Sequence, residues 1–204
     1  PLEINKMNKE RGSARVLTSA EFKRVVKMQE SNKYSLRNIC CLYISFYLML
    51  RAKEIASLSI STFVDASGNL KKEVLLKRTM TKGAKQRKVY LTNEKLRKVI
   101  KDYLKYRQSN NTYDMDAPFI LSQKKCSFTP DTMQKLFSKF YRAVGLDGAS
   151  SHSGRRTGAT NLFENGIDVR NVQVLLGHSQ ISSTIIYLQE NPALLGKISN
   201  KMNI

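Results

Sequence analysis

The fold is decided by residues 152–187, which read HSGRRTGATNLFENGIDVRNVQVLLGHSQISSTIIY. Gly166 and Gly177 each follow a helix-compatible run and can take the left-handed conformation that ends a helix. Asp168 can cap the run after it, and Ser182 can open a last short helix that carries Tyr187. We therefore expect three consecutive helices: one from about Gly154 to Gly166, one from Val169 to Leu176, and one from Ser182.

The sequence before this stretch is also mostly helical. Thr18 and Glu21 form a capping box, which marks the start of a helix. A run from Leu36 to about Leu50 is apolar on nearly all sides and predicts a central, buried helix. Helical spacing of apolar residues resumes after Thr92, and the Thr129-Pro130 pair is typical of a helix start.

A short region between these helices has the two-residue period of a sheet. Residues 58–61 alternate, residues 74–76 are β-compatible, residues 81–86 read as a hairpin tip and residues 88–91 as the returning strand. The expected fold class is mainly α with a small three-stranded antiparallel sheet (α+β). The length of 204 residues fits one such domain.

The charge of the chain points to a polyanionic partner. Lys and Arg number 35 and Asp and Glu 16, which gives a formal net charge of +19. Such a protein repels itself unless it meets a polyanion, and nucleic acid is the first candidate. A basic membrane-surface protein is the competing interpretation, although the longest apolar stretch, Ile39–Leu50, is too short to span a bilayer.

The cysteines indicate a reducing compartment. Cys40, Cys41 and Cys126 are odd in number and form no Cys-x-x-Cys pair. We expect a reduced intracellular protein with buried structural thiols.

The two histidines of the chain stand in the same C-terminal segment as two arginines and a tyrosine. His152 and His178 are accompanied there by Arg155, Arg156 and Tyr187. The sequence contains no zinc motif, no acidic cluster for magnesium and no Gly-rich phosphate loop. Arginine forks suit phosphate oxygens, histidine moves protons near neutral pH, and tyrosine can act as a covalent nucleophile. We therefore hypothesise that these residues carry out phosphoryl transfer with neither a metal nor a cofactor.

Five segments in the same order resemble the motifs of the tyrosine recombinases, the phage integrase family. Each motif alone is weak, but the ordered set is specific, and residues 152–187 are its strongest part. They are Leu50-Arg51-Ala52-Lys53-Glu54-Ile55 (arginine box), Thr81-Lys82-Gly83-Ala84-Lys85-Gln86-Arg87 (hairpin lysine), His152-Ser153-Gly154-Arg155-Arg156-Thr157 (His-x-x-Arg box), Leu175-Leu176-Gly177-His178-Ser179 (Leu-Gly-His box) and Ser183-Thr184-Ile185-Ile186-Tyr187 (nucleophile box).

The resemblance implies a role for each site residue. Tyr187 would attack a DNA phosphate and form a 3′-phosphotyrosyl link. Arg51 and Arg155 would bind the non-bridging oxygens, and His178 would donate a hydrogen bond to them. His152 would accept the tyrosine proton, and Lys82 would protonate the departing 5′ oxygen. Neither metal nor ATP is then needed. Glu54 is expected to orient Arg51 or to hold local structure rather than to react.

Two glycines depart from the family pattern. Gly154 and Gly158 stand where larger residues are usual, which we expect to affect the packing of the helix behind Arg155 and not the chemistry. Arg156, beside the box, is expected to contact the DNA backbone or a helix face.

The resemblance also implies an organisation and partners. Residues 1–16 are expected to form a basic linker or arm that follows a missing upstream DNA-binding domain, since the chain starts at Pro1. Residues 17–190 would be the catalytic domain and residues 191–204 a tail that exchanges between subunits. The expected partners are double-stranded DNA, three further copies in a homo-tetramer on DNA (monomer when free), and an accessory DNA-bending or directionality factor. No membrane partner is expected, and the location would be cytoplasmic, at the nucleoid.

Two other functions stay open on the sequence alone. A type IB topoisomerase-like enzyme would use the same chemistry to relax supercoils without exchanging strands. A catalytically silent DNA-binding module would keep the motifs only as relics. The expected function remains a site-specific recombinase or integrase.

Overall fold

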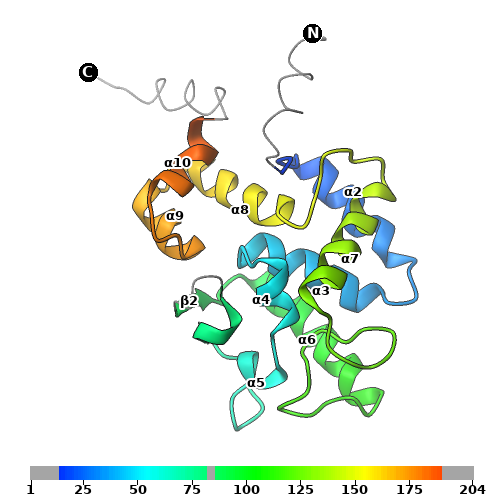
Figure 1. Ribbon diagram of the computed structural model, residues 1–204. Coiled ribbons are helices and arrows are strands. Elements are labelled where there is room, and N and C mark those ends of the chain that lie inside the picture. Colours follow the sequence, from blue (N-terminus) through cyan, green and yellow to red (C-terminus); the bar gives the residue numbers. More distant parts are fainter. Residues whose placement is uncertain (1–13, 82–85, 190–204) are drawn as a thin grey trace.

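The computed structural model describes residues 14–81 and 86–189 of the chain (Figure 1). The predictions for residues 1–13, for Lys82 and for the tail 191–204 lie outside the described residues. Within them, the helices are α2 (Ser19–Glu30), α3 (Ser35–Tyr47), α4 (Ala52–Ala56), α5 (Ile60–Phe63), α6 (Glu94–Ser109), α7 (Pro130–Arg142), α8 (Ser153–Glu164), α9 (Val169–Leu176) and α10 (Ser182–Gln189), with a 3₁₀ turn, η1, at Arg78–Met80 and strands β1 (Glu73–Leu76) and β2 (Arg87–Tyr90).

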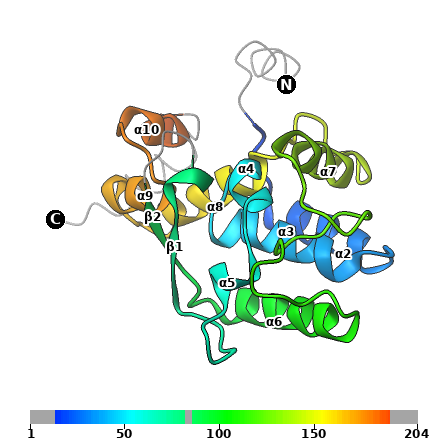
Figure 2. The same ribbon diagram turned by 60° about the horizontal axis from the view of Figure 1, so that its bottom comes forward.

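Helix α3 is the central helix that the apolar run predicts, and it ends three residues earlier, at Tyr47. It packs against α2 and α6 and also against α8, so it connects the N-terminal helices to the helices that follow α7 (Figures 1 and 2). Cys40, Cys41 and Ile44 are fully buried in it. The start of α2 is also as predicted, because Thr18 and Glu21 form the capping box.

The small antiparallel sheet is confirmed, but in the described part of the chain it has two strands and not three. β1 and β2 pair with Val74 opposite Val89. The predicted first strand at 58–61 is wrong, because Ser59 caps the short helix α5 after a single bridge to Pro118. Four alternating residues were too few to outweigh the local capping hydrogen bonds of Ser59.

The three C-terminal helices form where the sequence predicts them. The side chain of Asp168 accepts the N–H groups of Arg170 and Asn171, and Gly177 ends α9 with φ of 65°. Helices α8, α9 and α10 pack on one another at one side of the molecule, next to β2 (Figure 2). They enclose a small second core of Met49, Ala159, Phe163, Val172 and Leu176, against which Tyr187 packs.

Helix α8 crosses α3 at very short range, and two glycines make this possible. A Cβ atom added to Gly154 would lie 2.5 Å from the hydroxyl of Ser45, and one added to Gly158 would overlap the backbone oxygen of Phe46. The departures from the family pattern at these two positions therefore concern packing, as expected. The close crossing sets the depth at which Arg155, between the two glycines, enters the protein.

Two further expectations concern the burial of the cysteines and the lack of a membrane-spanning segment. Cys40 and Cys41 are buried free thiols, but Cys126 is exposed, so the expectation of buried cysteines is wrong for the third. In the described residues, no helix has the length and apolar character needed to cross a bilayer.

We predict that Gly158→Ala destabilises the fold. Alanine is the better helix former by about 1 kcal/mol, but the overlap with the carbonyl of Phe46 is with backbone, which cannot rotate away. Overpacking of this kind typically costs about 1–3 kcal/mol, so we expect a net loss. Urea unfolding measures it, and Glu164→Ala, at an exposed site of α8, is the control. A Gly158→Ala variant as stable as the control would contradict the close packing of α8 against α3.

Candidate active site

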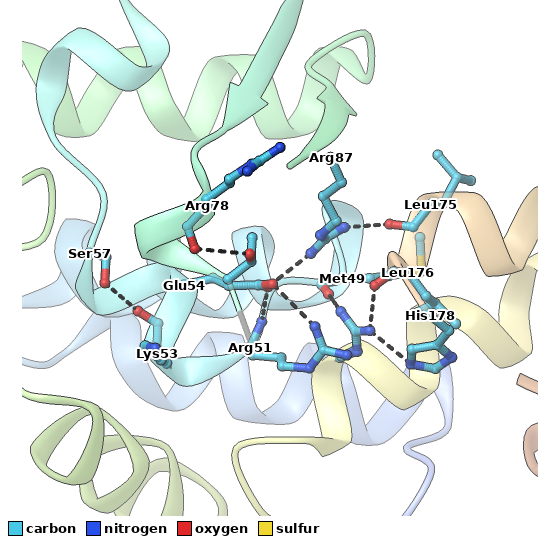
Figure 3. A network of polar contacts seen from close by, with 12 residues as sticks. Met49, Arg51, Lys53, Glu54, Ser57, Arg78, Arg87, Leu175, Leu176 and His178 are labelled. Atoms are coloured by element: carbon cyan, nitrogen blue, oxygen red, sulfur yellow. Dashed lines mark hydrogen bonds and ion pairs between the residues drawn. The ribbon is translucent and has the colours of Figure 1, made fainter. Parts of the chain in front are cut away.

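A cavity of about 440 Å³ opens between α4, β2 and the turn after α9. Figure 3 shows that the side chains of Arg51, Glu54, Arg87 and His178, which line this cavity, lie in one network of polar contacts. The cavity is lined by Arg51, Glu54, Thr81, Gln86, Arg87, Lys88, Tyr90, Val174, Gly177, His178 and Ser179. Residues far apart in the sequence thus share one polar, basic space.

Glu54 is a buried carboxylate that two arginines share. It is fully buried, and its oxygens lie 3.2 Å from Nη1 of Arg51 and 2.8 Å from Nη2 of Arg87. It also accepts the backbone N–H of Arg51 at 2.7 Å, which caps α4. Burial by itself would raise the pKa of Glu54, but Arg87 and the N–H of Arg51 outweigh it, and the net pKa is lowered. Glu54 therefore orients Arg51, as expected, and is ionised at neutral pH.

Arg155 enters the site from α8 and is almost fully buried, with 2% of its surface exposed. Its Nη1 donates to the carbonyl of Met49, and its Nη2 donates to the carbonyl of Leu176 at 2.7 Å and contacts Nε2 of His178 at 3.0 Å. Burial and the nearby Arg51 and Arg87 lower the pKa of Arg155 to about 9. The guanidinium stays charged at pH 7, and carbonyl oxygens rather than a carboxylate hold it.

The C-terminal end of α9 supplies one carbonyl acceptor to Arg87 and one to Arg155. The carbonyls of Leu175 and Leu176 accept Arg87 and Arg155 respectively. Terminal carbonyls of a helix have no intrahelical partner and carry partial negative charge, so cations are favoured there. Gly177, in the left-handed conformation, leaves room for the arginine, since a Cβ at this position would overlap Cδ of Arg87.

His178 follows this helix end and is held at both ring nitrogens. Nε2 faces Arg155, and Nδ1 lies 2.9 Å from Oγ1 of Thr184. Burial, followed by the positive charges of Arg155, Arg51 and Arg87, lowers the pKa of His178 to about 4. The imidazole is therefore neutral in this state at physiological pH.

Tyr187 lies beside the cluster on α10. Its ring centroid is 6.1 Å from that of His178, and the guanidinium carbon of Arg156 lies 5.4 Å from it. The predicted contact of Arg156 with a helix face is thus made with the tyrosine ring of α10. Because α10 packs on α8 and α9 of its own chain, Tyr187 reaches the cluster without a second copy.

The structure brings Arg51, Arg155, His178 and Tyr187 together. His152 forms the N-cap of α8, one turn before Arg155, and its side chain is exposed. Lys82 lies outside the described residues, but Thr81 and Gln86 on either side of that gap both line the cavity.

Sequence reasoning missed Arg87. It was read only as the end of the hairpin box, yet it is buried and joins β2 to both Glu54 and α9. The signal was available in strand alternation: Val89 faces the core, so Arg87, two residues before it, must face the same side.

The chemistry of this donor set is that of an anion site. Arg51 and Arg87 share the carboxylate of Glu54, and the buried Arg155 has no carboxylate of its own, so positive charge is in excess among these four residues. Planar arginine forks match the oxygens of a phosphate. No group of three His, Cys, Asp or Glu residues that could hold a metal ion occurs in residues 14–81 and 86–189.

Comparison with known proteins identifies relatives. The sequence profile of the phage integrase family matches residues 15–193. Tyrosine recombinase XerC of Caldanaerobacter subterraneus subsp. tengcongensis is 40% identical over 123 residues, which cover 59% of this chain and 34% of the relative. The chain spans about half the length, or less, of the first curated relatives that it matches.

Solved structures show the same fold. The crystal structure of XerA recombinase superposes with a TM-score of 0.76 at 25% identity, over 93% of this chain and 66% of that chain. XerH site-specific recombinase, bound to palindromic difH substrate in a post-cleavage complex, superposes with a TM-score of 0.69 at 23% identity, over 92% of this chain and 53% of that chain. The mainly helical fold with a small antiparallel sheet is therefore confirmed.

We predict that Glu54→Gln destabilises the protein in a pH-dependent way. At pH 7 it leaves Arg87 buried without a carboxylate, a change that typically costs about 3–5 kcal/mol. The folded-state pKa of Glu54 is lowered, so its stabilisation is present above the unfolded pKa of about 4.3 and is lost as the pH falls through the folded value. The stability difference between wild type and variant should therefore shrink in acid.

Urea unfolding at pH 7 and at lower pH values measures this difference. Glu73→Gln is the matched control, because Glu73 pairs with Lys88 at the surface, where both side chains are about half exposed; its effect should be close to zero. A difference for Glu54→Gln that stays constant or grows in acid would contradict the role of the carboxylate.

Proposed function

The chain belongs to the phage integrase family, and from this premise we propose that it is the catalytic domain of a tyrosine-type site-specific DNA recombinase. Tyr187 attacks a DNA phosphorus, forms a 3′-phosphotyrosyl ester and releases a 5′-hydroxyl. The observation that supports this best is the Arg155–His178 hydrogen bond beside Arg51 and the Tyr187 ring. Four separate segments of the chain meet there, and two of these residues, Arg51 and His178, line the cavity.

Arg51 and Arg155 bind the non-bridging oxygens, where negative charge develops as the tyrosine adds. Both guanidinium groups are already in place, which means that little reorganisation accompanies the reaction. Loss of one donor of this type typically lowers the rate by about 10²–10³. His178, beside Arg155, is the third donor to the phosphate.

Proton transfers fall to two further residues. His152, at the exposed start of α8, accepts the phenolic proton of Tyr187 and later returns it. Lys82, which lies between Thr81 and Gln86 in the sequence, protonates the departing 5′ oxygen. The phosphotyrosyl ester keeps the energy of the broken bond, so resealing to another 5′-hydroxyl requires neither ATP nor a metal.

Double-stranded DNA is the proposed partner. The net charge of +19 suits a phosphate backbone, and neutralisation of phosphates releases counterions, so binding falls steeply with salt. The relative XerH was solved bound to its DNA substrate, which supports the same class of ligand here. Recombination between two duplexes further implies a tetramer on DNA and, in some systems, an accessory DNA-bending or directionality factor.

We also propose the domain organisation expected from the sequence. Residues 1–16 act as a basic arm, residues 17–190 as the catalytic domain and residues 191–204 as a tail that contacts a neighbouring subunit. The match over residues 15–193 supports the central assignment. The type IB topoisomerase alternative is not favoured, because the relatives found are recombinases.

We predict that Tyr187→Phe abolishes the covalent protein–DNA adduct and leaves DNA binding intact. The variant loses only the phenolic oxygen, while the ring keeps its packing against α8 and α9. The substrate is a pool of nicked duplexes of random sequence, in which the short fragment diffuses away after cleavage and traps the adduct. Denaturing gels detect the adduct, and fluorescence anisotropy measures binding.

Tyr90→Phe is the matched control, since Tyr90 also lines the cavity and has the same hydroxyl to lose. The adduct should persist in this variant. An adduct that survives in Tyr187→Phe would exclude Tyr187 as the nucleophile. No adduct with the wild-type chain, with duplex binding intact, would favour the silent DNA-binding module.

We predict that deletion of residues 191–204 weakens assembly on DNA. Leu194, Leu195 and Ile198 have helical apolar spacing, so the tail has a face that a neighbouring subunit could bury. Sedimentation of the chain with a synthetic four-way DNA junction should show smaller complexes after the deletion, while Lys201→Ala should leave them unchanged. Complexes of equal size with and without the tail would exclude the exchange.

A further inference from the structure

Thr184 contacts the side of the His178 ring that faces away from Arg155. It belongs to the nucleophile box, but no role has been assigned to it above. Its side chain is fully buried on α10, one helical turn before Tyr187. Its Oγ1 lies 2.9 Å from Nδ1 of His178, while Nε2 of the same ring lies 3.0 Å from Nη2 of Arg155. The imidazole is therefore fixed between a donor on one side and a hydroxyl on the other.

The chemistry of these partners determines the tautomer. An arginine guanidinium has five donors and no acceptor, so Nε2 of His178 must accept from Arg155 and carries no proton. The ring proton of the neutral imidazole is then on Nδ1 and is donated to Oγ1 of Thr184. The groups that face the ring agree with a neutral form: Arg155, Arg51 and Arg87 are positive, and Glu54 is the one negative group among them.

This tautomer does not suit the proposed reaction. His178 is to donate a hydrogen bond to the phosphate, and Nε2 is the nitrogen on the side of Arg155, which binds the same phosphate. In the state seen here, Nε2 has a lone pair and would repel a phosphate oxygen. Donation requires the proton on Nε2, and Nδ1 must then accept a hydrogen bond.

We propose that Thr184 is the positioning residue that supports both tautomers of His178, and that phosphate binding changes Nδ1–H to Nε2–H. This inference rests on the proposed function. A hydroxyl is one donor and two acceptors, so it can accept from Nδ1–H before DNA binds and donate to bare Nδ1 afterwards. The ring gains one proton at Nε2 from solvent and releases one from Nδ1 to solvent, so it is neutral before and after the change.

The switch also has a consequence for Arg155. While Nε2 accepts from Nη2 of Arg155, that N–H is occupied in the protein. When the phosphate enters, it takes over this N–H, and the reversed imidazole adds its own donor. A single change of tautomer thereby converts one internal hydrogen bond into two donors aimed at the substrate.

Nitrogen NMR tests the tautomer directly, before any activity is measured. The chain has two histidines, so a His152→Asn variant leaves one ring to assign. In the DNA-free wild-type chain we expect Nδ1 of His178 to be protonated and Nε2 to be bare. Protonation of Nε2, or of both nitrogens, at neutral pH would overturn the inference.

Kinetics test the role of the hydroxyl. Thr184→Val keeps the shape of the side chain and removes the hydroxyl. We expect the rate of single-turnover cleavage of the nicked duplex pool to fall about ten- to a hundredfold. This factor is taken by analogy from metal sites, where loss of the residue that orients a histidine through its second ring nitrogen has an effect of this size. DNA affinity should be unchanged, and Thr184→Ser should restore most of the rate. Thr160→Val is the matched control, because Thr160 is equally buried and its hydroxyl has no hydrogen-bond partner in the described residues.

The outcomes separate this inference from the proposed function. No adduct with the wild-type chain would remove the proposed function, whatever the NMR result. Normal wild-type cleavage together with full activity of Thr184→Val would remove only the inference. A rate loss that Thr184→Ser does not recover, or that Thr160→Val shares, would show that Thr184 acts through packing alone and would equally overturn it.

Discussion

The site depends on the concentration of arginine charge around one buried carboxylate. Arg51 and Arg87 both pair with Glu54, and Arg155 lies close enough for Arg51 and Arg87 to disfavour its charged form. Such a cluster opposes folding unless each group is compensated. Here the compensation is one carboxylate and a set of backbone carbonyls, which neutralises less charge than the arginines bring. This excess of positive charge is why we propose an anion as the ligand of the site.

The carbonyls that hold the arginines come from points where the chain departs from regular structure. Leu175 and Leu176 end α9, and the left-handed Gly177 directs the chain away so that their oxygens stay accessible. Met49, whose carbonyl accepts Arg155, has φ of 50°, which is uncommon for a residue other than glycine. A buried guanidinium and the backbone around it thus stabilise each other. The local conformation of both turns serves the placement of Arg155 and Arg87.

The sequence predicted much of this and missed parts for physical reasons. Helix ends carry their own signals, so the capping box at Thr18, the cap at Asp168 and the stop at Gly177 were all correct. The strand at 58–61 was wrong, because alternation over four residues carries less information than the capping of Ser59. The ordered motifs predicted the candidate site residues. The sharing of the Glu54 carboxylate by two arginines and the contact of Thr184 with His178 are tertiary contacts, which the motifs do not encode. Neither spacing nor composition records which nitrogen of an imidazole meets which neighbour.

An assembled cluster also has to avoid acting without its substrate. In this structure Nη2 of Arg155 is engaged with Leu176 and His178, and Tyr187 packs against the small core of α8 and α9. These contacts occupy most of the donors of the cluster, but Nε of Arg87 is buried without a hydrogen-bond partner in the described residues. Under the proposed function, a phosphate oxygen would replace an internal acceptor of Arg155 such as Nε2 of His178, so its binding is an exchange of hydrogen bonds rather than the filling of free donors.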